Sequence, residues 1–200
     1  MKAVVAERPA PKPELWVIGI GASAGGISSL IQLLPSVPQS LPACFVVVLH
    51  LAPDHKSYLA DILGRNCNMP VKEAQNNELL REGVVYIAPP NAHITVVNNR
   101  LRLGLEPPVH MHRPSIDVLF ESIADEFKER GIGILLSGAG CDGSDGLRRV
   151  KAAGGSTLVQ DPREASFASM PEHGRDTGCA DYVVPVKEIA AQLSNLCLTN

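Results

Sequence analysis

The sequence predicts an α/β protein with a doubly wound, mostly parallel sheet flanked by helices. Its apolar runs are short, rich in β-branched residues and continuous rather than alternating, which is typical of strands buried on both faces. Segments with helical apolar spacing lie between most of these runs. Strands that alternate with helices in this way build a parallel sheet with helices packed on it.

The runs predict six strands of this sheet. They cover residues 15–20, 44–49, 84–87, 132–136, 156–159 and 182–184. Five helices are predicted between and after them, at 27–34, 57–67, 115–127, 143–153 and 187–196. Pro114 stands where the third helix starts, and Gly154-Gly155 ends the fourth.

One segment, near 94–105, departs from the parallel pattern. Two apolar stretches, 94–97 and 101–105, flank Asn98-Asn99-Arg100. This arrangement predicts an antiparallel hairpin, which we expect at an edge of the sheet. The loop from Glu106 to Pro114 that follows contains two histidines, an arginine and three prolines, and surface loops of this kind often carry function.

Length and composition favour one domain in the cytoplasm. The 200 residues suit a Pro-rich lead-in at 1–14 followed by one folded domain at 15–197. The lead-in lacks the apolar segment of a signal peptide, and no run reaches the length of a membrane span. A net charge of −3 argues against nucleic-acid binding. Five scattered cysteines without paired spacing predict reduced thiols and no metal site.

Gly21-x-Ser23-x-Gly25 follows the first predicted strand and fits the pattern of a nucleophile elbow. Small residues on both sides let the chain turn sharply into a helix, whose N-terminal N–H groups form a ready oxyanion site. A phosphate-binding loop is an equally good interpretation of this segment alone. However, no acidic residue ends the next strand to bind a ribose.

His50 ends that next strand and is the candidate general base. A lone histidine here would more often be a buried side chain bonded to the backbone. Its place at the carboxyl end of the strand beside the elbow favours a functional role, because the ligand crevice of such sheets lies there.

Asp142 lies in a glycine-rich loop after the fourth predicted strand and is the candidate acid. It would hold His50 in the correct tautomer and stabilise the imidazolium. The alternative role is an N-cap for helix 143–153. Asp145 is the competing carboxylate, although its place in the first helical turn suits a partner of the helix dipole.

His112 and Arg113 are further candidates for substrate binding, and Arg113 could bind a substrate carboxylate or carbonyl. An arginine before a helix is as readily a surface charge. The order Ser, His, Asp differs from the Ser, acid, His order of the α/β-hydrolases, so this is a different fold with a similar elbow.

The motifs, taken in order, resemble the catalytic domain of the CheB-type protein-glutamate methylesterases of chemotaxis. The resemblance runs over about residues 15 to 193 and depends on IGIGASAGG at 18–26, HLAP at 50–53, YIAP at 86–89, HRPSIDVLF at 112–120, LSGAGCDG at 136–143, QD at 160–161 and MP at 170–171. It implies a parallel α/β domain with a Ser23, His50, Asp142 triad and no cofactor. It also implies hydrolysis of glutamyl γ-methyl esters on chemoreceptor helices with release of methanol, and deamidation of certain glutamines.

For an oxyanion site we expect the backbone N–H groups of Ala24 and of the turn at Ala139 and Gly140. Ala24 and Ala139 stand where enteric members of this family have larger side chains. The backbone N–H donors are kept, but the shape of the pocket changes, and with it the expected substrate preference. Only about 14 residues precede the first strand, too few for the receiver domain usual in the family. We therefore expect a free-standing enzyme or part of a fusion, for instance with a methyltransferase.

Partners are expected to be methylated receptor helices, without nucleic acid or membrane insertion. Arg113, Arg163 and Arg175 fall in predicted loops and are candidates to meet an acidic receptor helix. Two other functions remain open: a serine hydrolase of a small ester or amide, and a non-catalytic nucleotide-binding module.

Overall fold

The computed structural model describes residues 15–50 and 58–198. The lead-in at 1–14 and the first residue of the helix expected at 57–67 lie outside the described residues. The main sheet has seven parallel strands in the order β3-β4-β2-β1-β7-β8-β9. The strands are β1 (Trp16–Ala22), β2 (Ala43–Leu49), β3 (Val71–Glu73), β4 (Val85–Ile87), β7 (Gly131–Leu135), β8 (Ser156–Gln160) and β9 (Tyr182–Val184).

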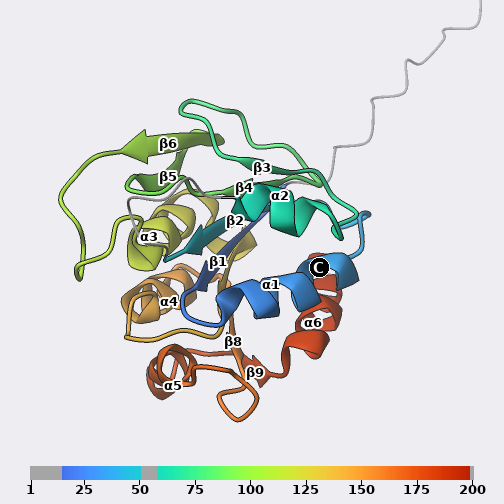
Figure 1. Cartoon of the computed structure of the whole chain (residues 1–200), viewed down its shortest axis with the longest axis vertical. Helices are drawn as coiled ribbons and strands as arrows, with labels where there is room; N and C mark the ends of the chain where they lie inside the picture. The colour runs from blue at the N-terminus through green and yellow to red at the C-terminus, as the bar shows by residue number, and fades with distance from the viewer. Residues whose placement is uncertain (1–14, 51–57, 199–200) are drawn as a thin grey trace, which may run out of the picture.

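Helices cover both faces of this sheet, as the strand pattern predicted. They are α1 (Gly26–Leu33), α2 (Leu59–Gly64), α3 (Ile116–Phe127), α4 (Ser144–Ala152), α5 (Ser169–Asp176) and α6 (Val186–Leu198), with short 3₁₀ turns at Leu34–Ser36 and Lys128–Arg130. Figure 1 shows α1 and α6 together on one side of the sheet and α3 and α4 together on the other. The doubly wound α/β prediction is confirmed.

Each face of the sheet has its own hydrophobic core. One cluster joins α1, α2 and α6 to residues of the central strands such as Ile18 and Phe45. The other joins α3, α4 and neighbouring strand residues such as Val17 and Val46. Because adjacent residues of one strand enter opposite cores, the central strands β1, β2 and β7 have no polar side chain and lack the alternation of a half-exposed strand.

The antiparallel hairpin of β5 (His93–Val97) and β6 (Arg100–Gly104) is also confirmed, with a different placement. It forms a two-stranded sheet of its own, whereas the edges of the main sheet are β3 and β9. The hairpin packs on α3, and Ser122 Oγ accepts a hydrogen bond from the Val96 N–H at 3.0 Å. It therefore covers the core on the α3 face instead of extending the sheet.

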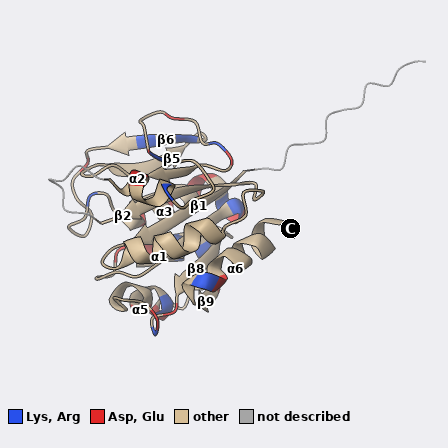
Figure 2. Cartoon of the chain, turned by 45° about the vertical axis from the view of Figure 1, so that its right-hand side comes forward, with Lys and Arg blue, Asp and Glu red and all other residues tan. Residues whose placement is uncertain are grey.

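Two elements were not predicted, β3 and α5. The strand β3 has three residues, and α5 contains both a proline and a glycine, so neither offers a clear periodic pattern. Figure 2 shows basic and acidic residues over several elements of the described chain, with the basic residues of β6 along the hairpin.

Candidate active site

The carboxyl ends of β1 and β2 place Ser23 and His50 side by side. The strands are paired in register up to Ala22 and Leu49, and the His50 N–H donates to the Ala22 carbonyl at 3.1 Å. Ser23 and His50 are the next residue of each strand, and neighbouring strands lie roughly 4.8 Å apart. Parallel pairing thus brings the candidate nucleophile and base to the same point, from positions distant in sequence.

The turn after Ser23 is made by Gly25, which has a φ of 75° and caps α1. A side chain at this residue would meet Ser137 Oγ at 2.7 Å. The left-handed backbone conformation thus lies two residues after the candidate nucleophile, and Ser23 itself has an ordinary negative φ. This differs from a strained nucleophile elbow, although the strand-to-helix turn that the pattern predicted is present.

His50 and Asp142 form a direct contact. The Nε2 atom of His50 lies 2.8 Å from Oδ2 of Asp142, and both side chains are almost entirely buried. This bond leaves Nδ1 of His50 to act on a substrate or nucleophile. In the described part of the chain, Nδ1 has no hydrogen-bond partner. Hydrogen bonds between a nucleophile and its base are often long before substrate binds. Proton transfer from Ser23 would therefore need Ser23 Oγ and His50 Nδ1 to come closer together.

Asp142 is held in place by the N-terminus of α3. Its Oδ1 accepts hydrogen bonds from Ser115 Oγ at 2.9 Å and the Asp117 N–H at 3.0 Å, and its Oδ2 accepts from the Ile116 N–H at 2.8 Å. Hydrogen bonds from His50 and these N–H groups outweigh burial and hold the pKa of Asp142 well below its usual range. The carboxylate is therefore charged and oriented.

Asp142 caps a helix other than the one expected. The N-cap of α4 is Gly143, so the alternative that Asp142 caps this helix is wrong. Instead, Asp117 serves α4: its Oδ1 accepts from the N–H groups of Gly143 at 2.9 Å and Gly146 at 2.7 Å. Each helix N-terminus is thus capped by a carboxylate from the other segment: Asp142, which precedes α4, binds N–H groups of α3, and Asp117 of α3 binds N–H groups at the start of α4. Burial and the negative charge of Asp142 raise the pKa of Asp117 to about 7.

A second polar network, around Ser137 and Gln160, holds the turn that follows Ser23. Ser137 Oγ donates to the Ala24 carbonyl at 2.9 Å and accepts from the Phe167 N–H at 3.0 Å. The side-chain oxygen of Gln160 accepts from the Ser137 N–H at 2.8 Å and from Ser29 Oγ at 3.0 Å. These bonds join the loops after β1, β7 and β8 beneath Ser23.

The expected oxyanion donors lie around Ser23. A side chain added at Gly138 would come within 2.9 Å of Ser23 Cβ, so the turn that leads to Ala139 and Gly140 lies directly against the candidate nucleophile. Ala139 and Gly140 are exposed. Among the described residues, none accepts a hydrogen bond from the N–H of Ala24, Ala139 or Gly140. These groups are free to bind developing negative charge.

His112 lies against the candidate base. The rings of His50 and His112 are stacked, with centroids 3.8 Å apart and planes within 9°. Burial and the neighbouring His50 lower the pKa of His112, which favours the neutral ring. His112 therefore fixes the plane of His50 without a second positive charge.

Arg113, a candidate for substrate binding or a surface charge, makes hydrogen bonds within the protein. Its guanidinium donates to Asn91 Oδ1 at 2.6 Å and to the carbonyls of Leu105 and Glu106 at 3.0 and 3.1 Å. These bonds hold the loop after the hairpin, and they occupy most of the donors that a substrate would need. Arg113 and His50 nevertheless line a common cavity of about 160 Å³ beside the exposed side chain of Met111.

Among the described residues, tertiary contacts bring together two groups of side chains that could bind a metal, although sequence spacing predicted none. They are His50, His112, Asp142 and His110, Asp117, Asp145, each with ligand atoms within 4.8 Å of one another. The first group is joined by the His50–Asp142 hydrogen bond. In the second, Asp117 caps α4 and Asp145 pairs with Arg148, as expected of a first-turn acid.

Sequence reasoning missed Ser115, Asp117, Ser137 and Gln160 as parts of the site. Ser115 and Asp117 carried a local signal, because a serine followed by an acid opens a predicted helix. That signal could not identify Asp142 as their partner, because the contact spans 25 to 27 positions of the sequence.

The fold and site define a hydrolytic α/β enzyme, a carboxylic ester hydrolase, with its polar residues at the carboxyl ends of parallel strands. The sequence model of the family described as CheB methylesterase matches residues 18–193, and the chain belongs to this family. The crystal structure of the Thermotoga maritima CheB methylesterase catalytic domain is similar, with a TM-score of 0.87 and 33% identity over 92% of this chain and 99% of that one.

Curated relatives agree with this assignment. A "putative protein-glutamate methylesterase/protein-glutamine glutaminase" of Leptospira interrogans (strain Fiocruz L1-130) is 37% identical over 86% of this chain and 90% of its own length. A protein-glutamate methylesterase/protein-glutamine glutaminase of Anaeromyxobacter dehalogenans is 39% identical over 94% of this chain. The chain spans 55% of the length of the latter.

Among the described residues, no helix has the length and apolar character needed to cross a bilayer.

Proposed function

We propose that this protein hydrolyses glutamyl γ-methyl esters on chemoreceptors, with Ser23, His50 and Asp142 as a catalytic triad. The observation that carries the proposal is the His50–Asp142 bond, made beside Ser23 at the carboxyl edge of the sheet. A buried carboxylate on one imidazole nitrogen leaves the other as a base, as in serine hydrolases. The names of the relatives supply the substrate class.

In this mechanism His50 Nδ1 takes the proton of Ser23 as Oγ attacks the ester carbonyl. The N–H groups of Ala24, Ala139 and Gly140 bind the oxyanion, and Asp142 stabilises the imidazolium. His50 then gives the proton to the leaving methoxide, which departs as methanol. Water activated by His50 hydrolyses the acyl-enzyme and restores Ser23, leaving a receptor glutamate. The same steps on a glutamine release ammonia, so deamidation belongs to the proposal.

The partners proposed are the cytoplasmic helices of methylated chemoreceptors, which places the enzyme in the cytoplasm. His112 forms the wall of the site beside His50, and no metal or organic cofactor enters any step. A phosphate-binding loop would have no use for the buried His50–Asp142 pair, so the site favours hydrolysis over nucleotide binding.

The test is methanol release from a methylated chemoreceptor cytoplasmic fragment. We expect release by the wild type, and a loss of roughly 10³-fold or more in the Ser23→Ala variant. Ser28→Ala is the matched control, because Ser28 is an exposed serine on α1. Full activity in Ser23→Ala would contradict the triad. Hydrolysis of small model esters with no release from receptor would favour the second function, a hydrolase of another ester or amide.

A further inference from the structure

His93, at the start of β5, is a buried histidine next to the site that the mechanism above does not use. Its side chain is only 3% exposed. Nδ1 accepts a hydrogen bond from the Ser115 N–H at 3.2 Å, and Nε2 lies 3.1 Å from the Pro107 carbonyl. A backbone N–H can only donate and a carbonyl only accept, so the ring is neutral with its proton on Nε2.

Ser115 connects this histidine to the candidate triad. Its hydroxyl donates to Asp142 Oδ1 at 2.9 Å, and the N–H groups of the next two residues also bind Asp142. As the N-cap of α3, Ser115 has an N–H with no partner inside the helix, and the residue is fully buried. His93 is the acceptor that satisfies this N–H group.

We propose that His93 is a positioning residue for Asp142. By binding the Ser115 N–H it keeps the hydrogen-bond donors at the start of α3 in place, and these donors orient the Asp142 carboxylate toward His50. The chain of contacts runs from His93 to Ser115, to Asp142 and to His50, and its three hydrogen bonds are 3.2, 2.9 and 2.8 Å long. A carboxylate that rotates away from His50 leaves the base misoriented, which lowers kcat. The proposal rests on the proposed function in that Asp142 acts through His50.

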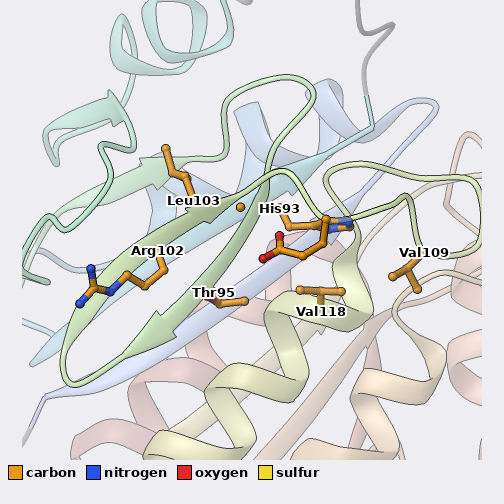
Figure 3. A pocket seen from close by; sticks show the side chains of 8 residues that line it. His93, Thr95, Arg102, Leu103, Val109 and Val118 are labelled. Atoms are coloured by element: carbon orange, nitrogen blue, oxygen red, sulfur yellow. The ribbon is translucent and has the colours of Figure 1, made fainter.

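The surroundings of His93 allow its two hydrogen bonds to be separated by substitution. Figure 3 shows His93 on the hairpin with Val118 of α3 below it, at the wall of a cavity of about 330 Å³. Asparagine places an oxygen where Nδ1 lies and keeps the acceptor for Ser115. Glutamine places an amide N–H near the position of Nε2 and keeps the donor for Pro107. Both side chains are no larger than histidine and fit this space.

The test compares His93→Asn with His93→Gln by kcat, KM and urea unfolding. Each variant loses one hydrogen bond, so we expect similar shifts of the unfolding midpoint. We expect His93→Asn to keep kcat close to wild type and His93→Gln to lose about tenfold or more in kcat with KM unchanged, because small misplacements of catalytic groups cost that much. Equal kcat values in the two variants would overturn the proposal.

Ser122→Ala is the matched control. It removes the bond from the Val96 N–H, which ties the same hairpin to the same helix without touching Ser115 or Asp142. We expect a lower unfolding midpoint with kcat unchanged. A fall in kcat as large as that of His93→Gln would show a merely structural effect and overturn the proposal. If His93→Gln fails to fold, Ser115→Ala tests the next link, and an unchanged kcat there would contradict the proposal.

A readout without substrate keeps this test separate from that of the proposed function. The imidazole proton that His50 shares with Asp142 is followed by proton NMR in the wild type and both variants. We expect its resonance and its exchange with water to change in His93→Gln and to persist in His93→Asn. An unchanged resonance in His93→Gln would overturn the positioning role. A changed resonance without any methanol release from receptor would count against the proposed substrate alone.

Discussion

Asp142 and Asp117 lie together at the junction of two helix N-termini, and their environments move their pKa values in opposite directions. Asp142 accepts bonds from His50 and two backbone N–H groups, which favours its charged form. Asp117 is buried beside that negative charge, which favours its neutral form and raises its pKa to about 7. Below about pH 7 the pair therefore carries mainly one negative charge, and that charge lies on Asp142, the residue that contacts His50.

This pair predicts a pH dependence of stability. Between about pH 4 and 7 the folded protein keeps a proton on Asp117 that the unfolded chain has released, so the free energy of unfolding falls as pH rises through this range. Asp117→Asn removes this titration, while its amide oxygen still accepts from Gly143 and Gly146. We expect urea unfolding to show a flatter pH profile in this variant, by up to about 1.4 kcal/mol per pH unit.

The control for this experiment is Asp125→Asn, which changes an exposed carboxylate on the same helix. Its profile should remain parallel to that of the wild type over the same pH range. Asp142 contributes in the other direction: its lowered pKa stabilises the fold above its usual pKa, and that contribution is lost as pH falls below it. Parallel profiles of wild type and Asp117→Asn would show that Asp117 titrates normally.

At the scale of elements, the turn from β1 into α1 depends on the glycine at position 25. Its φ of 75° belongs to the left-handed region, and an added Cβ would lie 2.7 Å from Ser137 Oγ and 2.9 Å from Ser166 Cβ. Ser137 cannot move freely, because it bonds both the Ala24 carbonyl and the Phe167 N–H. Backbone strain and crowding therefore act together at this residue.

We expect Gly25→Ala to cost about 2–4 kcal/mol of unfolding free energy, more than strain alone, because the polar network beneath Ser23 must shift. Gly178→Ala is the matched control: its φ is 70°, and nothing lies within 4 Å of an added Cβ. That variant should lose only about 1–2 kcal/mol from the left-handed backbone. Urea unfolding of both variants measures the difference. Equal losses of unfolding free energy in the two variants would mean that crowding against Ser137 does not contribute to the cost.

The elements that the sequence predicted well are those whose signal is local. All six expected strands of the main sheet are present within one or two residues, because most of them are continuous apolar runs between turn residues. The site was predictable to the extent that residues follow strand ends, which identified Ser23, His50 and Asp142 as neighbours. The reciprocal caps of α3 and α4 and the bonds of Arg113 depend on tertiary contacts and left no periodic pattern. The same holds for the hairpin, which packs on α3 and not on the sheet edge.

At the scale of the whole molecule, the sheet separates two cores, which have no side chain in common among the described residues. Leu193 on α6 lies in one cluster and Leu147 on α4 in the other, and both are fully buried. The strands between them are rigid and close-packed, so a cavity on one face has no side chain in common with the opposite face. Energetic effects on the two faces should then be independent.

This independence predicts additive losses of stability. We expect Leu193→Ala and Leu147→Ala each to lower the free energy of unfolding by about 2–5 kcal/mol, from lost apolar burial and the cavity that remains. The double variant should lose the sum of the two within about 0.5 kcal/mol, since the sites share no contacts. Urea unfolding followed by both circular dichroism and the fluorescence of Trp16 makes the measurement and shows whether one transition describes the chain. A coupling free energy well above that margin would mean that the sheet transmits repacking from one face to the other. Changes in the core beneath α1 and α6 would then also alter the hydrogen bonds that hold Asp142 at the N-terminus of α3.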